Sequence, residues 1–89
     1  MIERQVPVIN PLGLHARAAA RFVHLSGQFA ASIRVGRGSR VVDGKSILGL
    51  LLLAAPRGAA IRITADGADE TAAIDALCGL VASGFGEEP

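Results

Sequence analysis

The sequence has no tryptophan, no tyrosine and only three phenylalanines among its 89 residues. Proteins that bind single-stranded nucleic acid usually stack the bases on aromatic side chains, and few such side chains are present here. The formal net charge is +1, and the basic residues form no stripe that would attract a phosphate backbone or an anionic membrane. These absences argue against a small α/β nucleic-acid-binding module, so we expect no nucleic acid among the partners.

Cysteine and long apolar segments are also scarce. Cys78 is the single cysteine, so no disulfide forms within the chain, which fits a reducing compartment. The longest apolar run covers residues 47–55 and falls well short of the roughly 20 residues that a membrane helix needs. Residues 1–5 lack the apolar core of a signal peptide. We therefore expect a cytoplasmic protein with no membrane partner.

The length of 89 residues predicts one domain over residues 1–89, with a modest core and no deep cleft. The hydrophobic content of 51% predicts a folded rather than a disordered chain. Apolar periodicity and turn residues predict a strand around Val6 and Val8, then a helix over 16–26. They next predict a hairpin of strands 32–35 and 40–43 around a turn at 36–39, a helix over 46–53, a strand over 60–64 and a helix that starts at 69–70. This β-α-β-β-α-β-α order predicts an α+β fold, a two-layer sandwich of helices on one face of a four-stranded antiparallel sheet.

A histidine precedes the first predicted helix in the stretch Gly13-Leu14-His15-Ala16-Arg17. Free backbone N–H groups at a helix N-terminus attract anions, and the arginine adds a planar set of donors that suits phosphate. His15 is therefore a candidate carrier of a phosphoryl group, and the simpler alternative is a histidine that only caps the helix. No acidic residue is near it in sequence to activate a hydrolytic water, although a distant one could fold close to it.

The second predicted helix begins at Ser46, which is a residue type preferred at the N-cap. Residues 47–53 are apolar on nearly all sides, whereas a helix on an open sandwich buries only one side. The excess apolar side chains should form an exposed patch, which usually marks an interface. The candidates for this apolar patch are Ile47, Leu48, Leu51 and Leu52.

The stretches Gly13-Leu14-His15-Ala16-Arg17 and Asp43-Gly44-Lys45-Ser46-Ile47-Leu48-Gly49-Leu50 occur in this order in a chain of this length. The chain thereby resembles HPr, the histidine-containing phosphocarrier family of the bacterial phosphoenolpyruvate-dependent phosphotransferase system. The ending Ser83-Gly84-Phe85-Gly86 resembles the nitrogen-related branch, and Lys45-Ser46-Ile47 with Gly49 resembles members regulated by serine phosphorylation. The resemblance implies an open-faced β-sandwich with antiparallel strand order 1-4-2-3 and three helices on one face.

The resemblance also implies roles for particular residues. His15 would accept a phosphoryl group on Nδ1 from phosphorylated enzyme I and pass it to an enzyme II A domain, with Arg17 stabilising the phosphate. Ser46 would be the target of an HPr serine kinase/phosphorylase. The apolar patch, together with Arg21, would bind partners. Such a protein is a stoichiometric carrier rather than a true catalyst, and we expect a monomer with no cofactor and no metal.

The sequence departs from the family pattern at several positions. Ala18 stands where proline is usual after the arginine, but alanine keeps the helix intact, so we expect transfer to survive. His24, Gly27 and Gly49 stand where other members carry lysines, which leaves less positive charge for docking. The alternative function is a mainly regulatory protein that acts through Ser46. Relatives of that kind lack the histidine, so the presence of His15 favours transfer.

Overall fold

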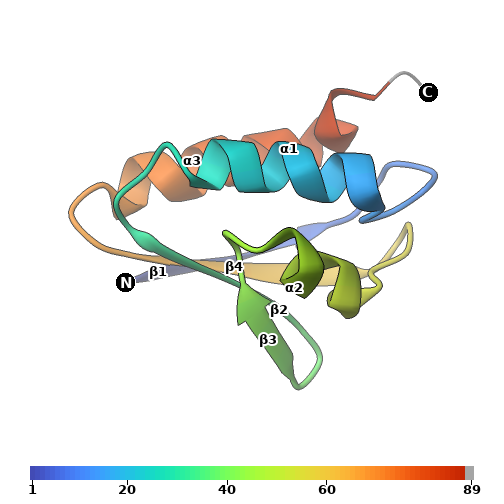
Figure 1. Cartoon of the computed structure of the whole chain (residues 1–89), viewed down its shortest axis with the longest axis horizontal. Coiled ribbons are helices and arrows are strands. Elements are labelled where there is room, and N and C mark those ends of the chain that lie inside the picture. Colours follow the sequence, from blue (N-terminus) through green and yellow to red (C-terminus); the bar gives the residue numbers. More distant parts are fainter. Residues whose placement is uncertain (88–89) are drawn as a thin grey trace.

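The structure is a computed structural model, and it describes residues 1–87 (Figure 1). The last two residues of the predicted domain, 88 and 89, lie outside the described part. The elements in chain order are β1 (Ile2–Pro7), α1 (Ala16–Ser26), β2 (Ser32–Arg37), β3 (Arg40–Asp43), α2 (Ile47–Leu53), β4 (Ala60–Asp66), α3 (Glu70–Ala82) and a short 3-10 turn, η1 (Gly84–Gly86). The predicted element order is confirmed.

The four strands form one sheet in the order β1-β4-β2-β3, and every neighbouring pair is antiparallel. This is the predicted architecture. Successive residues of β4 alternate between the two faces of the sheet. Ile61, Ile63 and Ala65 are buried toward the helices, whereas Arg62 and Thr64 lie on the other face of the sheet.

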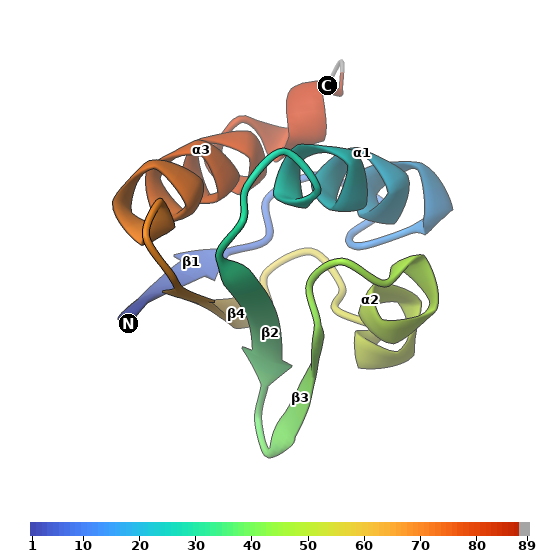
Figure 2. The same cartoon turned by 60° about the vertical axis from the view of Figure 1, so that its left-hand side comes forward.

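Helices cover one face of this sheet. Helices α1 and α3 lie side by side above it, and α2 packs against α1 and against the β2–β3 hairpin (Figures 1 and 2). The buried side chains between the layers form one cluster, to which every helix contributes. Its largest fully buried members include Phe22, Ile33, Leu50, Ile63, Ile74 and Leu77.

The predicted hairpin turn was wrong at its first two residues. Gly36 and Arg37 belong to β2, and they pair with Val41 and Arg40 of β3. Glycine suits this strand position because the Arg62 side chain of β4 crosses it, and a Cβ there would lie 2.5 Å from Nη2 of Arg62. Strand β4 also extends two residues beyond the predicted end at Thr64.

Helix length is limited throughout residues 1–87. No helix in this part of the chain is both long enough and apolar enough to cross a membrane.

Candidate functional site

The loop before α1 is fixed by a close approach at Gly13. Its φ is +66°, and a Cβ at this position would lie 2.4 Å from the carbonyl oxygen of Ala55. Glycine is therefore required on two grounds, its backbone conformation and the lack of space. The next residue, Leu14, is buried, and its N–H donates to the same Ala55 oxygen at 2.9 Å. These contacts with the segment after α2 position the residue that follows, His15.

His15 is the N-cap of α1. Its backbone is extended, with φ −78° and ψ 179°, and its carbonyl accepts the first helical hydrogen bond, from the N–H of Ala19 at 2.8 Å. Its ring nitrogen Nδ1 accepts a hydrogen bond from the backbone N–H of Arg17 at 3.3 Å. Nδ1 therefore lies at the N-terminus of the helix, where free N–H groups and the helix dipole favour negative charge.

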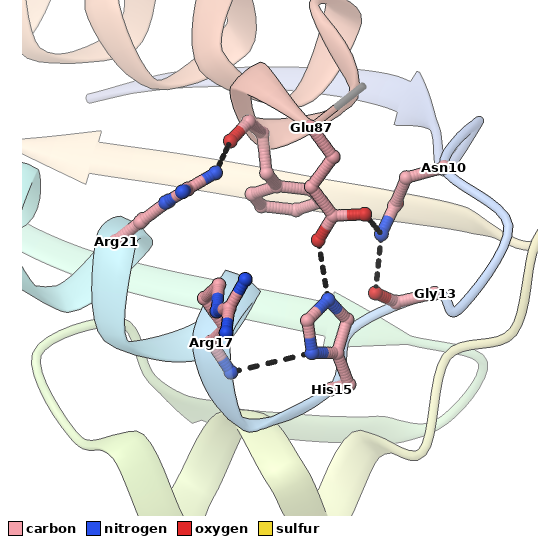
Figure 3. Close-up of polar contacts among 7 residues, drawn as sticks. Asn10, Gly13, His15, Arg17, Arg21 and Glu87 are labelled. Atoms are coloured by element: carbon pink, nitrogen blue, oxygen red, sulfur yellow. Dashed lines mark hydrogen bonds and ion pairs between the residues drawn. The ribbon is translucent and has the colours of Figure 1, made fainter. Parts of the chain in front are cut away.

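The other ring nitrogen contacts an acidic residue from the far end of the chain. Nε2 of His15 is hydrogen-bonded to Oε1 of Glu87 (Figure 3). Oε2 of Glu87 accepts a hydrogen bond from Nδ2 of Asn10 at 3.3 Å, and the same Nδ2 donates to the carbonyl of Gly13 at 2.7 Å. The hydrogen bond from His15 holds the pKa of the Glu87 carboxyl below its usual value, against a partial burial that acts the other way. The amide of Asn10 and the charge of Arg21 also lower this pKa.

The turn after α3 carries Glu87 to this position. Gly84, Phe85 and Gly86 have φ values of +69°, +59° and +72°. Glycine adopts such values readily, whereas phenylalanine does so at a cost, and here the Phe85 side chain is fully buried. The guanidinium of Arg21 donates to the carbonyl of Phe85, which ties the turn to α1 (Figure 3). In the sequence, residues 83–86 carry only the resemblance to the nitrogen-related branch, and no pattern indicates that Glu87 lies at the site.

The predicted site residues on α1 share one surface depression. It is lined by Leu12, His15, Ala16, Arg17, Arg21, Gly86 and Glu87. The side chains of Arg17 and Arg21 are exposed there, and two guanidinium groups beside a helix N-terminus suit a dianionic phosphoryl group. The structure thus brings His15, Arg17 and Arg21 together.

Ser46 lies on another element and does not line this depression. It is the N-cap of α2, as expected, and its Oγ accepts a hydrogen bond from the N–H of Gly49 at 3.0 Å. All four residues of the apolar patch are exposed: Ile47 by 43%, Leu48 by 68%, Leu51 by 37% and Leu52 by 54%. Leu50 and Leu53, on the inner side of the same helix, are buried. The role of this patch in binding partners stays a prediction.

Metal binding finds no support in the part of the chain that the structure describes. Within residues 1–87, no three His, Cys, Asp or Glu side chains are grouped so that they would hold a metal ion. His24 is exposed on α1, away from the depression around His15.

Comparison with known proteins identifies the family of this chain. Residues 2–83 match the family described as "PTS HPr component phosphorylation site". The chain belongs to the HPr family. A phosphocarrier protein HPr from Cupriavidus necator is 46% identical to it, with 98% of each chain covered. This chain is therefore an HPr-type phosphocarrier of the phosphotransferase system.

Solved structures of HPr agree with this assignment. The crystal structure of HPr-C-His from Thermoanaerobacter tengcongensis covers 100% of both chains, with a TM-score of 0.95 at 40% identity. A crystal structure of an HPr dimer from the same organism covers 98% of this chain and 100% of that one, with a TM-score of 0.78 at 40% identity. The family match ends at residue 83, so Glu87 lies beyond it.

Proposed function

We propose that His15 accepts a phosphoryl group on Nδ1 from phosphorylated enzyme I and donates it to enzyme II A domains. The observation that supports this most directly is the position of Nδ1 at the N-terminus of α1, where it accepts from the N–H of Arg17. The family membership supports a phosphocarrier in general, and the position of His15 at the helix N-terminus supports it as the acceptor.

The surroundings of His15 suit transfer of a phosphoryl group between proteins. Transfer of this kind depends mainly on positioning and on stabilising charge, which N–H groups and arginines provide without acting as a base. Both oxygens of the Glu87 carboxylate are already hydrogen-bonded, Oε1 with His15 and Oε2 with Asn10. A shallow depression also leaves the ring accessible to two different partners in turn.

The test is incubation with enzyme I and phosphoenolpyruvate, followed by measurement of the intact mass. We expect one added phosphoryl group that is labile in acid and stable in alkali. His15→Ala should abolish the addition, and the matched control His24→Ala should keep it. An adduct that is stable in acid, or that persists in His15→Ala, contradicts the proposal.

Arg17 is proposed to stabilise the phosphoryl group in transit. Its side chain is exposed beside His15, so removal should change stability little. Arg17→Ala should therefore slow single-turnover transfer from enzyme I while the melting temperature stays the same. An unchanged rate with saturating enzyme I removes Arg17 from the mechanism.

We further propose that Ser46 is phosphorylated by an HPr serine kinase/phosphorylase, and that the apolar patch with Arg21 binds enzyme I and the A domains. A phosphate on Ser46 would place charge beside Ile47 and Leu48, and that charge would have to lose water when the patch meets a partner. A mainly regulatory protein is the alternative function. It would use Ser46 but accept no phosphoryl group on His15, so the mass measurement separates the two.

The remaining proposals concern organisation. We propose a single domain over residues 1–89 that acts as a monomer in the cytoplasm without a cofactor. Because one related HPr structure is a dimer, light scattering on the purified chain is the appropriate measurement. A mass of two chains at micromolar concentration contradicts the monomer.

A further inference from the structure

The contact between Glu87 and His15 joins residues 72 positions apart in the chain. The Glu87 side chain is only 16% exposed and lies between the imidazole and the amide of Asn10. Asn10 is itself buried and bound to the carbonyl of Gly13. The carboxylate is therefore held from both sides, and the tie between Arg21 and Phe85 fixes the turn that carries it (Figure 3).

We propose that Glu87 is a positioning residue for phosphoryl transfer, which holds the proton of His15 on Nε2 and balances the charge that the ring gains when Nδ1 bonds to phosphorus. This inference rests on the proposed function. It concerns Glu87, which lies beyond residues 2–83, the span of the family match.

The two neighbours of the ring determine which nitrogen carries the proton. A neutral imidazole has one donor nitrogen and one acceptor nitrogen. A carboxylate only accepts, so Nε2 is the donor to Glu87. The backbone N–H of Arg17 only donates, so Nδ1 is the acceptor and keeps a free lone pair. Both contacts select the same tautomer, the one in which Nδ1 is the nucleophile.

Charge balance gives Glu87 its second effect. In the transfer step, the Nδ1 lone pair forms the bond to phosphorus, and the bond between phosphorus and the donor atom breaks, with the donor atom keeping the electron pair. No proton leaves His15, because Nε2 keeps its hydrogen. The ring therefore becomes a cation, and a carboxylate in direct contact stabilises that cation.

The same contact helps the return step. When the phosphoryl group moves to the next acceptor, the electron pair of the N–P bond returns to Nδ1. Because Nε2 still carries its hydrogen, the ring leaves as a neutral imidazole rather than as an imidazolate. Carboxylates commonly orient metal-bound histidines through the second nitrogen, where their loss costs roughly tenfold to 100-fold in metal affinity or activity. We expect an effect of similar size at His15.

The charged groups around the ring support this assignment. Arg17 and Arg21 line the same depression as His15, and Arg21 also donates to the carbonyl of Phe85. Glu87 is the acidic residue in that lining, and its hydrogen bond with His15 holds its pKa below the ordinary value, so the carboxylate form is favoured. The site thus combines two arginines with one carboxylate, and that carboxylate contacts Nε2 of His15.

The experiment compares two substitutions at Glu87 with a matched control. Glu87→Gln keeps an oxygen that can accept from Nε2 but removes the charge, and Glu87→Ala removes both. Glu3→Gln makes the same change of charge at an exposed residue of β1. Each protein is labelled with ¹⁵N for ring spectra, checked for folding by circular dichroism, and tested in single-turnover transfer from phosphorylated enzyme I.

We expect the ring spectra to show a hydrogen on Nε2 that exchanges slowly in the wild type and in Glu87→Gln, and quickly in Glu87→Ala. The transfer rate should fall by roughly tenfold or more in Glu87→Ala and by less in Glu87→Gln. Glu3→Gln should match the wild type in both measurements.

The outcomes separate this inference from the proposed function. A wild type that accepts no phosphoryl group on His15 overturns the proposed function, and the role of Glu87 in transfer falls with it. A wild type that accepts the group no faster than a folded Glu87→Ala overturns the role of Glu87 alone. Slow exchange at Nε2 in Glu87→Ala would show that the carboxylate does not hold the ring.

Discussion

His15 and Ser46 occupy equivalent places at the starts of two helices. Each has an extended backbone, and each side chain accepts a hydrogen bond from a backbone N–H of the helix it begins. The bond runs to Nδ1 of His15 from the second residue after it and to Oγ of Ser46 from the third residue after it. Apart from this difference of one residue, the two N-cap positions have similar local geometry.

The surroundings distinguish them. His15 lies beside two arginines, and its second nitrogen contacts a carboxylate. Ser46 precedes a helix whose outer side is apolar. A nucleophilic nitrogen next to positive charge suits the carriage of phosphate, whereas a hydroxyl next to exposed leucines suits a position where added charge alters docking. The two N-cap residues therefore differ in the side chains that surround them, and this difference underlies the separate roles proposed for them.

The most severe test makes the two caps alike. In His15→Ser, the new side chain still caps α1, because serine is a preferred N-cap residue, but no nucleophilic nitrogen remains. We expect a folded protein with no phosphoryl acceptance, measured by circular dichroism and by intact mass after incubation with enzyme I. Ser46→Ala, as the counterpart, should keep full acceptance and lose on the order of 1 kcal/mol in the free energy of unfolding. Acceptance in His15→Ser would mean that another residue carries the group.

The next test removes the support of one cap. Gly13→Ala forces a Cβ against the Ala55 carbonyl at a positive φ, and it should lower the free energy of unfolding by about 3 kcal/mol. The matched control is Gly38→Ala, which has a similar φ of +59° but no atom within 4 Å of the added Cβ. That control should lose only about 1 kcal/mol. Equal losses in urea denaturation would show that crowding at Gly13 does not fix the loop.

A smaller effect is expected from charge at the second cap. Ser46→Asp places a carboxylate beside the apolar patch, which must lose water when a partner covers it. We expect the KM for enzyme I to rise severalfold, with a smaller fall in kcat. Steady-state transfer over a range of carrier concentrations measures both. If Ser46→Asp equalled the wild type at low concentration, neither the patch nor Ser46 would govern docking.

The smallest expected effect is a shift in one titration. The pKa of Glu87 is lowered first by its hydrogen bond with His15, so His15→Ala should raise it toward the ordinary value. Because the folded pKa is depressed, the contact is present at neutral pH and is lost as pH falls through that pKa. Asp69 is the control, since its pKa is lowered mainly by the backbone N–H groups of Ala30 and Ala31. Carboxyl ¹³C titration of the wild type and of His15→Ala should show a higher pKa for Glu87 in the variant and the same pKa for Asp69 in both proteins.

The sequence predicted those features that depend on local pattern. Alternating residues such as Ile61 and Ile63 identified β4, and Ser46 identified the start of α2. Gly36 was misinterpreted as a turn residue because its place in β2 depends on pairing with β3 and β4, which leaves no local signal. Glu87 escaped for a similar reason. Its contact depends on a buried phenylalanine at positive φ, and no periodicity indicates that conformation.

The contact between His15 and Glu87 encloses nearly the whole described chain in a single loop. The pairing of β1 with β4 and the packing of α3 on β1 already close most of this loop, so the contact itself requires only the ordering of the turn after α3. Detachment of the turn after α3 would release the ring of His15 while the sheet stayed intact. The state of this one imidazole therefore reports whether the turn after α3 is docked against α1.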